Sequence, residues 1–299
     1  MTDSNPLSAL DLAKLLLLAA IWGGAFILMR LVVPELGALL TASLRIIVAG
    51  LALLLFAYLR QIPLQWRANI KVYALSGLLG ALLPFALFCY ASSYLPAAFS
   101  ALFNAACPLF VALFSLLWLN ESLNLRTLAG LLLGAFGVLV LVGSCVLLHS
   151  RLTLLAALAC IAAPACFALS GIIIKRYSCA NNLQRAHKII EPLPLAVGSM
   201  VAAALMCLPI LPFLLPAQLP SPLSILLLLT LALLPSALAQ IIFIPLLAKI
   251  GPTRAMSVSF LIPLFSLVGG VLFLQESLPL SSLGGGLMVL TATALILKR

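Results

Sequence analysis

Residues 104–130 read NAACPLFVALFSLLWLNESLNLRTLAG, and residues 259–285 read SFLIPLFSLVGGVLFLQESLPLSSLGG. From Pro108 and from Pro263 onward the two stretches agree at 11 of 23 positions without a gap, and the shared residues include a Glu, a Ser and a Gly as well as leucines. A repeat with an offset of 155 residues predicts that the chain consists of two copies of one structural unit.

The composition is that of a membrane protein. Of the 299 residues, 65% are hydrophobic and only 7% are charged, whereas a soluble domain carries roughly 25% charged residues. A helix needs roughly 20 apolar residues to cross the hydrocarbon core of a bilayer. We therefore expect an all-α integral membrane protein with ten transmembrane helices, at residues 12–33, 39–59, 70–94, 97–119, 125–147, 152–175, 192–215, 223–248, 253–274 and 280–297.

The basic residues orient these helices. If the N-terminus is cytoplasmic, thirteen of the sixteen Lys and Arg lie at or near cytoplasmic ends, where such residues accumulate and meet anionic lipid. Both termini are then cytoplasmic, as is the basic loop at 176–191. Because each half holds an odd number of helices, the repeats at 1–147 and 152–299 enter the membrane from opposite sides and are inverted. The net charge of +10 therefore does not indicate nucleic-acid binding.

Two prolines mark the middle of the repeated spans. Pro108 and Pro263 stand at matching positions, and a proline inside a helix removes the hydrogen bond to the carbonyl four residues back and kinks the helix. Those carbonyls belong to Asn104 and Ser259, and a freed carbonyl is tolerated in lipid only where it faces protein or a water-filled cavity. We interpret Asn104 and Ser259 as substrate-binding residues; the alternative is that they only hydrogen-bond between helices.

Aromatic and amide side chains at mid-span extend this site. Trp22 lies halfway along the first span beside two glycines, and Phe167 holds a similar place in the sixth span. An amphipathic aromatic residue away from the membrane interface suits a cavity wall, with helix packing as the alternative. Tyr90 and Gln240, in the third and eighth spans, are two further candidate substrate-binding residues.

The charged residues stand mostly at the ends of the spans. Arg30 and Arg45 lie toward outer ends, where an ionisable residue indicates function unless it snorkels or pairs structurally, and Glu35 is a candidate partner. Glu121 and Glu276 precede the fifth and tenth spans, and we interpret them as charges at the N-terminal ends of those helices. No carboxylate lies at the midplane, and the seven cysteines form no C-x-x-C pair. The sequence thus predicts neither a metal nor a cofactor.

In combination these residues resemble the EamA-type transporters of the drug/metabolite transporter superfamily. The resemblance rests on both halves of the chain: Trp22-Gly-x-x-Phe26, Arg30, Arg45, Pro108-Leu-Phe with Glu121 and Gly130, and the run from Ile250 to Ala255 ahead of Pro263 and Glu276. It implies ten helices in two inverted repeats around a cavity walled mainly by helices one, three, four, six, eight and nine. It also implies a bacterial inner-membrane exporter of amino acids and related metabolites, although other relatives carry nucleotide sugars, triose phosphates or S-adenosylmethionine.

The sequence as a whole predicts a secondary active transporter, not an enzyme. We expect an exporter of small organic metabolites, above all amino acids or related compounds, that works by alternating access. The alternatives are an importer or exchanger of a nucleotide-like or S-adenosylmethionine-type metabolite, a membrane-embedded lipid-modifying enzyme, which would need an acid, His or nucleophile cluster, and a structural subunit without a cavity. The expected partners are a small-molecule substrate and the lipid bilayer, and the expected state is a monomer or homodimer.

Overall fold

A computed structural model describes residues 8–119, 125–146, 150–184, 191–216, 219–250, 258–277 and 280–297. Nearly all of these residues are helical. In chain order the elements are α1 (Ala9–Leu36), α2 (Ala38–Leu59), α3 (Trp66–Gly77), η1 (Leu78–Leu82), α4 (Leu83–Ser92), α5 (Ala97–Asn104), α6 (Cys107–Leu119), α7 (Leu125–Val146), α8 (Arg151–Gln184), α9 (Pro192–Cys207), η2 (Leu211–Phe213), α10 (Pro222–Ala232), η3 (Leu233–Leu238), α11 (Ala239–Ile250), α13 (Val258–Leu274) and α14 (Leu280–Leu297).

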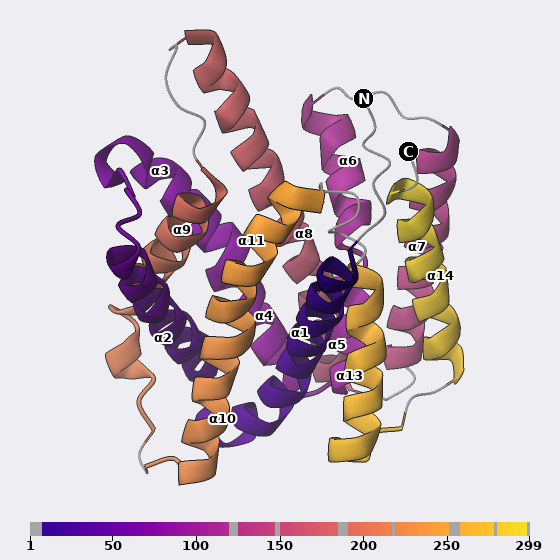
Figure 1. Cartoon of the computed structure of the whole chain (residues 1–299). Helices are drawn as coiled ribbons and strands as arrows, with labels where there is room; N and C mark the ends of the chain where they lie inside the picture. Colours follow the sequence, from indigo (N-terminus) through magenta and orange to yellow (C-terminus); the bar gives the residue numbers. More distant parts are fainter. Residues whose placement is uncertain are drawn as a thin grey trace.

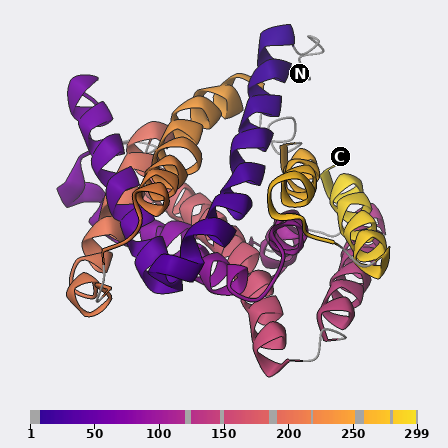
Figure 2. The same ribbon diagram turned by 90° about the horizontal axis from the view of Figure 1, so that it is seen from below.

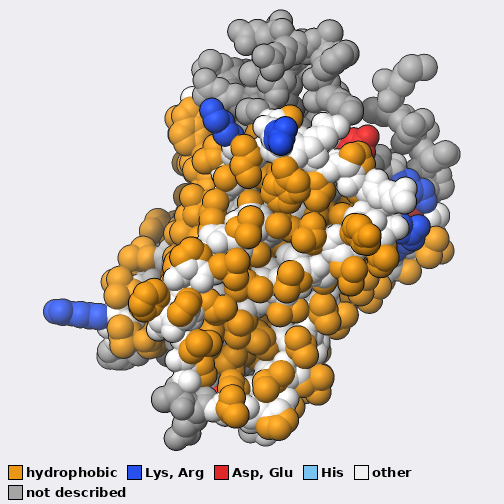
Figure 3. Space-filling view, turned by 90° about the vertical axis from the view of Figure 1, so that its left-hand side faces the viewer, with side chains coloured by type: hydrophobic (Ala, Val, Ile, Leu, Met, Phe, Trp, Pro, Cys, Tyr) orange, Lys and Arg blue, Asp and Glu red, His pale blue; other side chains and the backbone are white. Residues whose placement is uncertain are grey.

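The described helices suit a membrane in length and in surface. Six helical stretches are long and apolar enough to cross a bilayer, and four shorter apolar helices accompany them in the described part of the chain. The helices form one bundle in which α1 begins and α14 ends at the same end of the molecule (Figure 1). On the face shown in Figure 3, hydrophobic side chains cover the middle and basic side chains lie toward the rim. Lipid can solvate such a surface because the backbone polar groups are paired inside the helices.

The two largest differences from the predicted spans are at the ends of α8 and α9. Helix α8 continues to Gln184, so the first part of the expected loop at 176–191 is helical; residues 185–190 lie outside the described ranges. Helix α9 ends at Cys207, eight residues before the predicted end of that span. Pro209 and Pro212 follow, and because proline cannot donate a backbone hydrogen bond, the chain turns into the short 3-10 helix η2 instead.

The repeat appears in the structure as a pair of π-helices that the sequence did not predict. Elements η1 and η3 begin at Leu78 and Leu233, which are 155 residues apart. In η3, Pro235 has no N–H for the carbonyl of Leu231, and the Ser236 hydroxyl donates to that carbonyl instead, at 3.1 Å. Each π-helix therefore interrupts a predicted span, the third and the eighth, near its middle, and π-helices are frequent at functional sites.

The proline of the opening repeat breaks one helix but not the other. Helix α5 ends at Asn104 and α6 begins at Cys107, so Pro108 stands in the first turn of a new helix. Helix α13, in contrast, continues through Pro263. The kink predicted at Pro108 is thus a full interruption between α5 and α6.

Small residues let the helices approach closely. Helices α7 and α14 lie side by side at one edge of the bundle (Figures 1 and 2). A Cβ added to Gly137 of α7 would lie 2.9 Å from the carbonyl oxygen of Gly285 in α14, and one added to Gly285 would lie 3.0 Å from that of Gly137. Gly137 and Gly285, in the fifth and tenth predicted spans, therefore serve packing between the two halves of the same chain.

Candidate functional site

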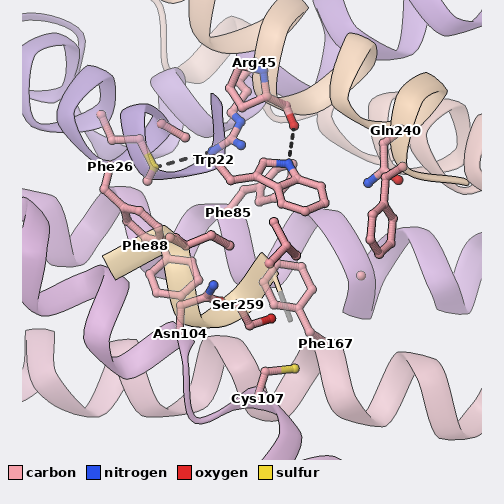
Figure 4. A pocket seen from close by; sticks show the side chains of 17 residues that line it. Trp22, Phe26, Arg45, Phe85, Phe88, Asn104, Cys107, Phe167, Gln240 and Ser259 are labelled. Carbon is pink, nitrogen blue, oxygen red and sulfur yellow. Dashed lines mark hydrogen bonds between the residues drawn. The ribbon is translucent and has the colours of Figure 1, made fainter. Parts of the chain in front are cut away.

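A cavity of about 240 Å³ lies in the middle of the bundle, between elements of both halves. Helix α1 contributes Trp22, the interruption between α5 and α6 contributes Asn104, and α8 contributes Phe167. From the second half, α11 contributes Gln240 and α13 contributes Ser259. Figure 4 shows Asn104 and Ser259 next to each other on one side of this space, with Trp22 and Arg45 on the other.

The cavity wall follows the sequence repeat. Several residues that line it stand at positions 155 residues apart in the two halves: Gly80 and Pro235, Phe85 and Gln240, Phe88 and Phe243, Asn104 and Ser259, Cys107 and Ile262. The members of each pair come from equivalent places in the two repeats. The cavity is therefore a joint product of both halves, and a movement of one half relative to the other would change its shape.

Four of the five predicted substrate-binding residues line this cavity, namely Trp22, Asn104, Gln240 and Ser259. Tyr90 does not. Its ring packs against Tyr94, with the ring centroids 5.3 Å apart, near the end of α4. Tyr90 follows Phe88 by two residues, and in a helix such neighbours point in different directions. The residues of α4 that line the cavity are Phe85 and Phe88.

Trp22 connects the two halves at the cavity wall. Its indole N–H donates a hydrogen bond of 3.1 Å to the carbonyl of Pro235 in the π-helix η3. Its ring meets that of Phe243 edge to face, with centroids 5.1 Å apart. The neighbouring Gly23 faces α13, where a Cβ would lie only 2.7 Å from the Cβ of Phe265. The Trp-Gly pair therefore combines a close helix crossing with a cavity wall.

Arg45, which the sequence placed toward the outer end of its span as either a functional or a structural charge, also lines the cavity. The side chain is 4% exposed, its Nε donates to the Ser236 hydroxyl at 2.7 Å, and its guanidinium carbon lies 3.8 Å from the centre of the Phe85 ring. The first of these contacts reaches η3, in the other half. Phe85 was missed, although its pairing with Gln240 across the 155-residue offset could have identified it.

Glu35 is not the partner of either arginine. Its carboxylate accepts hydrogen bonds from the backbone N–H and the hydroxyl of Ser221 and from the hydroxyl of Ser224. These serines stand at the N-terminal end of α10, where backbone N–H groups and the helix dipole favour an anion. Proximity along the chain had suggested an Arg partner, but the end of α1 meets the start of α10 instead.

Arg30 of α1 and Glu276, which follows α13, form an ion pair. Arg30 donates to the Ser92 carbonyl at 2.6 Å, and its Nε lies 3.7 Å from the Glu276 carboxylate. That carboxylate accepts the Ala97 N–H, at 3.1 and 2.9 Å to its two oxygens. Glu276 therefore sits at the N-terminal end of α5, in the first half, and not at the start of the tenth span as predicted. Its counterpart Glu121 lies outside the described residues.

The electrostatics of Glu276 reflect this partly buried position. Burial raises the pKa of its carboxyl above the ordinary value, and the Ala97 N–H and the charge on Arg30 offset part of that rise. The carboxyl of Glu276 thus connects the segment after α13 to the first half of the chain. Its partial burial makes its ionisation less favourable than that of an exposed carboxyl.

This geometry defines a class of protein: a helical membrane protein whose two repeated halves enclose a cavity between them. The chain belongs to the EamA-like transporter family, whose sequence pattern matches residues 12–143 and 154–298. The resemblance suggested by the motifs is thereby confirmed. The chain is a multi-pass membrane protein, and family membership indicates a transporter.

Individual relatives agree with this assignment. The chain is 29% identical over 290 residues to an uncharacterized transporter of Bacillus subtilis (strain 168), YvbV, covering 93% of this chain and 88% of that protein. It is 27% identical over 294 residues to a protein of Salmonella typhimurium named a probable amino-acid metabolite efflux pump, covering 92% and 90% of the two chains. A protein crystal structure with 18% sequence identity matches with a TM-score of 0.60 over 93% of this chain and 97% of its own, which shows the shared fold. Both named relatives are bacterial, in agreement with the expected inner-membrane location.

Proposed function

We propose that this protein is a secondary transporter that exports a small organic metabolite, an amino acid or a related compound, by alternating access. In this proposal ten helices cross the membrane in two inverted repeats, with both termini in the cytoplasm. The cavity opens alternately to either side as one repeat rocks against the other. The observation that carries the proposal is the cavity wall itself, since residues 155 positions apart line it from both halves.

The wall suits a small substrate with an apolar body and a few polar groups. Six aromatic residues are among those that line it, and Asn104, Gln240 and Ser259 offer hydrogen-bonding groups. Ligand sites commonly combine a largely apolar lining with few, well-placed polar groups. The name of the Salmonella relative, which refers to amino-acid metabolite efflux, supports both the substrate class and the outward direction.

The alternative substrates are larger than the cavity favours. Pockets for drug-sized ligands measure roughly 300–1,000 Å³, and the cavity here measures about 240 Å³. A nucleotide-like or S-adenosylmethionine-type metabolite would need a wider site than an amino acid. The volume therefore favours the smaller substrate, and an importer or exchanger of the larger class is the second candidate.

Counterflow into proteoliposomes tests the proposal. Purified protein would be reconstituted into vesicles preloaded with one unlabelled solute, and uptake of the same labelled solute would be followed for apolar amino acids and for nucleosides. We expect counterflow of at least one amino acid and none of nucleosides. Asn104→Leu should reduce the amino-acid signal about tenfold or more, because the substrate would lose a hydrogen bond inside a dry site.

Thr291→Leu is the matched control. Thr291 lies on the exposed side of α14, and its hydroxyl donates to the Leu287 carbonyl of its own helix at 2.8 Å. The same change from a polar residue to Leu within a helix should leave counterflow intact there. Normal counterflow by Asn104→Leu would remove Asn104 from the site, and no counterflow of any solute by the unmodified protein would refute the carrier proposal.

A further inference from the structure

Arg45 brings a positive charge to the cavity wall, and the other described residues that line the cavity are neutral. The side chain is 4% exposed and projects from α2 toward the cavity (Figure 4). An arginine remains charged in proteins, and burying a charge costs free energy unless a partner of opposite charge compensates it. Burial of this guanidinium therefore costs free energy unless an anion lies next to it.

The contacts that Arg45 makes with the described residues leave its charge uncompensated. Arg45 donates from Nε to the Ser236 hydroxyl at 2.7 Å, approaches the Met29 sulfur with Nη1 at 3.5 Å and stacks over Phe85. None of these partners is an anion. Both ion pairs found among the described residues, Arg30 with Glu276 and Lys249 with Asp11, lie elsewhere. The Ser236 and Phe85 contacts fix the plane of the guanidinium while leaving Nη2 free for another acceptor.

The charge is also an exception to the internal symmetry. The 155-residue offset that relates the paired cavity residues places Met200 opposite Arg45 in the second half. Met200 is 5% exposed and packs in an apolar cluster with Ala49 and Ala203. Met200 is not among the residues that line the cavity, so the cationic group on one side has no charged counterpart at the equivalent position. A substrate in the cavity would be held in one orientation.

We propose that Arg45 is the docking group for the carboxylate of the transported molecule, so that the substrate class is an apolar compound with one carboxylate. A guanidinium presents parallel N–H donors that match the two oxygens of a carboxylate. The rings of Phe85, Phe88 and Phe243 then enclose the apolar part of the substrate. This inference rests on the proposed transport function and adds a recognition group to it.

Competition during counterflow tests the inference with the unmodified protein. Counterflow of labelled phenylalanine would be challenged with 3-phenylpropionate, which keeps the carboxylate and lacks the amine, and with phenylalaninamide, which lacks the carboxylate. Leucine and leucinamide would form a second pair if phenylalanine is not carried. We expect the carboxylate compounds to compete at least about tenfold better than the amides, as a charge-assisted bidentate contact implies. Equal competition by acid and amide would overturn the inference.

Variants assign the discrimination to this residue. Arg45→Gln should abolish the preference for acid over amide, and Arg45→Lys should keep part of it because the charge remains. Arg60→Gln is the matched control: Arg60 follows the last residue of the same helix, and its side chain is exposed. A preference unchanged in Arg45→Gln would overturn the assignment, as would one lost equally in Arg60→Gln.

The outcomes separate the two proposals. Counterflow of phenylalanine or leucine without any preference for the carboxylate would refute the role of Arg45 and leave the transport function standing. The absence of counterflow for every solute would refute both. If Arg45→Gln does not fold, the test rests on how much better the acid competes than the amide in the unmodified protein and in Arg45→Lys. Both proteins have a cation at this position, so both should prefer the acid.

Discussion

Trp22 shows how one side chain can serve both packing and the cavity. Its ring forms part of the wall, and its N–H satisfies the Pro235 carbonyl. In a regular helix the Pro235 carbonyl would accept a hydrogen bond from the N–H of Ala239, four residues on. In the π-helix η3 the Ala239 N–H donates to the Leu234 carbonyl instead. The indole thus supplies a hydrogen bond where the π-helix η3 leaves an acceptor open.

We expect Trp22→Phe to retain the ring contact with Phe243 and lose this hydrogen bond. A buried acceptor left without a donor costs about 1–3 kcal/mol, so the apparent unfolding temperature in detergent should fall. Trp118→Phe is the control, because Trp118 is 48% exposed on α6 and no hydrogen bond of its indole is found among the described residues. An equal fall in both variants, measured by thermal unfolding, would contradict the importance of the Pro235 contact.

At the scale of elements, the most extensive contact between two helices in the described part of the chain is that of α7 with α14, one from each half. A Cβ at Gly137 would meet the Gly285 carbonyl at 2.9 Å and the Met288 Cβ at the same distance. Neither a backbone oxygen nor a Cβ can move without moving its helix. The space between these helices is therefore set by the absence of a side chain.

Gly137→Ala should separate α7 from α14 and destabilise the protein by about 1–3 kcal/mol, as overpacking usually does. Gly143→Ala, on the same helix, is the control, since nothing lies within 4 Å of a Cβ placed there. Alanine favours a helix over glycine by roughly 0.5–1 kcal/mol, so the control should be neutral or more stable. Comparable unfolding temperatures for the two variants would show that α7 and α14 tolerate separation.

Glu276, which joins α5 to the segment after α13, should make the stability of the folded protein depend on pH. Because burial raises the pKa of its carboxyl in the folded protein, the folded state binds the proton more tightly than the unfolded chain does. The stability that protonation confers is complete below the ordinary carboxyl pKa and is lost as the pH rises through the raised value.

Glu276→Gln mimics the protonated form at every pH and keeps an oxygen for the Ala97 N–H. On acidification from neutral pH, we expect the unfolding temperature of the unmodified protein to rise relative to that of Glu276→Gln. Thermal unfolding of both proteins across a pH series measures the difference. A relative fall on acidification would mean that Arg30 and Ala97 outweigh burial and hold the carboxyl ionised.

At the scale of the whole molecule, the inverted repeat depends on the number of crossings. Alkaline phosphatase is active only outside the cytoplasm, and we expect a fusion after Arg299 to be inactive while a fluorescent protein at the same place is bright. A truncated fusion after Gly37, between α1 and α2, should give the opposite result. An active phosphatase at the C-terminus would overturn the ten-helix topology.

The sequence predicted the helical spans and the central residues because they depend on local chemistry. Apolar length sets a span, and the matched prolines marked Asn104 and Ser259. The errors arose where contacts between distant segments decide the outcome. Glu35 meets the start of α10, Glu276 meets the start of α5 and Arg45 reaches η3. Tyr90 packs against Tyr94, whereas Phe85 and Phe88 of the same helix line the cavity, and composition alone does not reveal which face of a helix points inward.

The paired π-helices carry information about the history of the chain. A π-turn inserts one residue's worth of backbone into a helix, and such turns are rare. Two that begin 155 residues apart, at the offset of the sequence repeat, are far better explained by inheritance than by two separate insertions. The ancestral half already contained the irregular turn before its gene was duplicated and fused. Arg45 and Met200 differ at equivalent positions, so the two halves kept the irregular turn while the charged position came to differ between them.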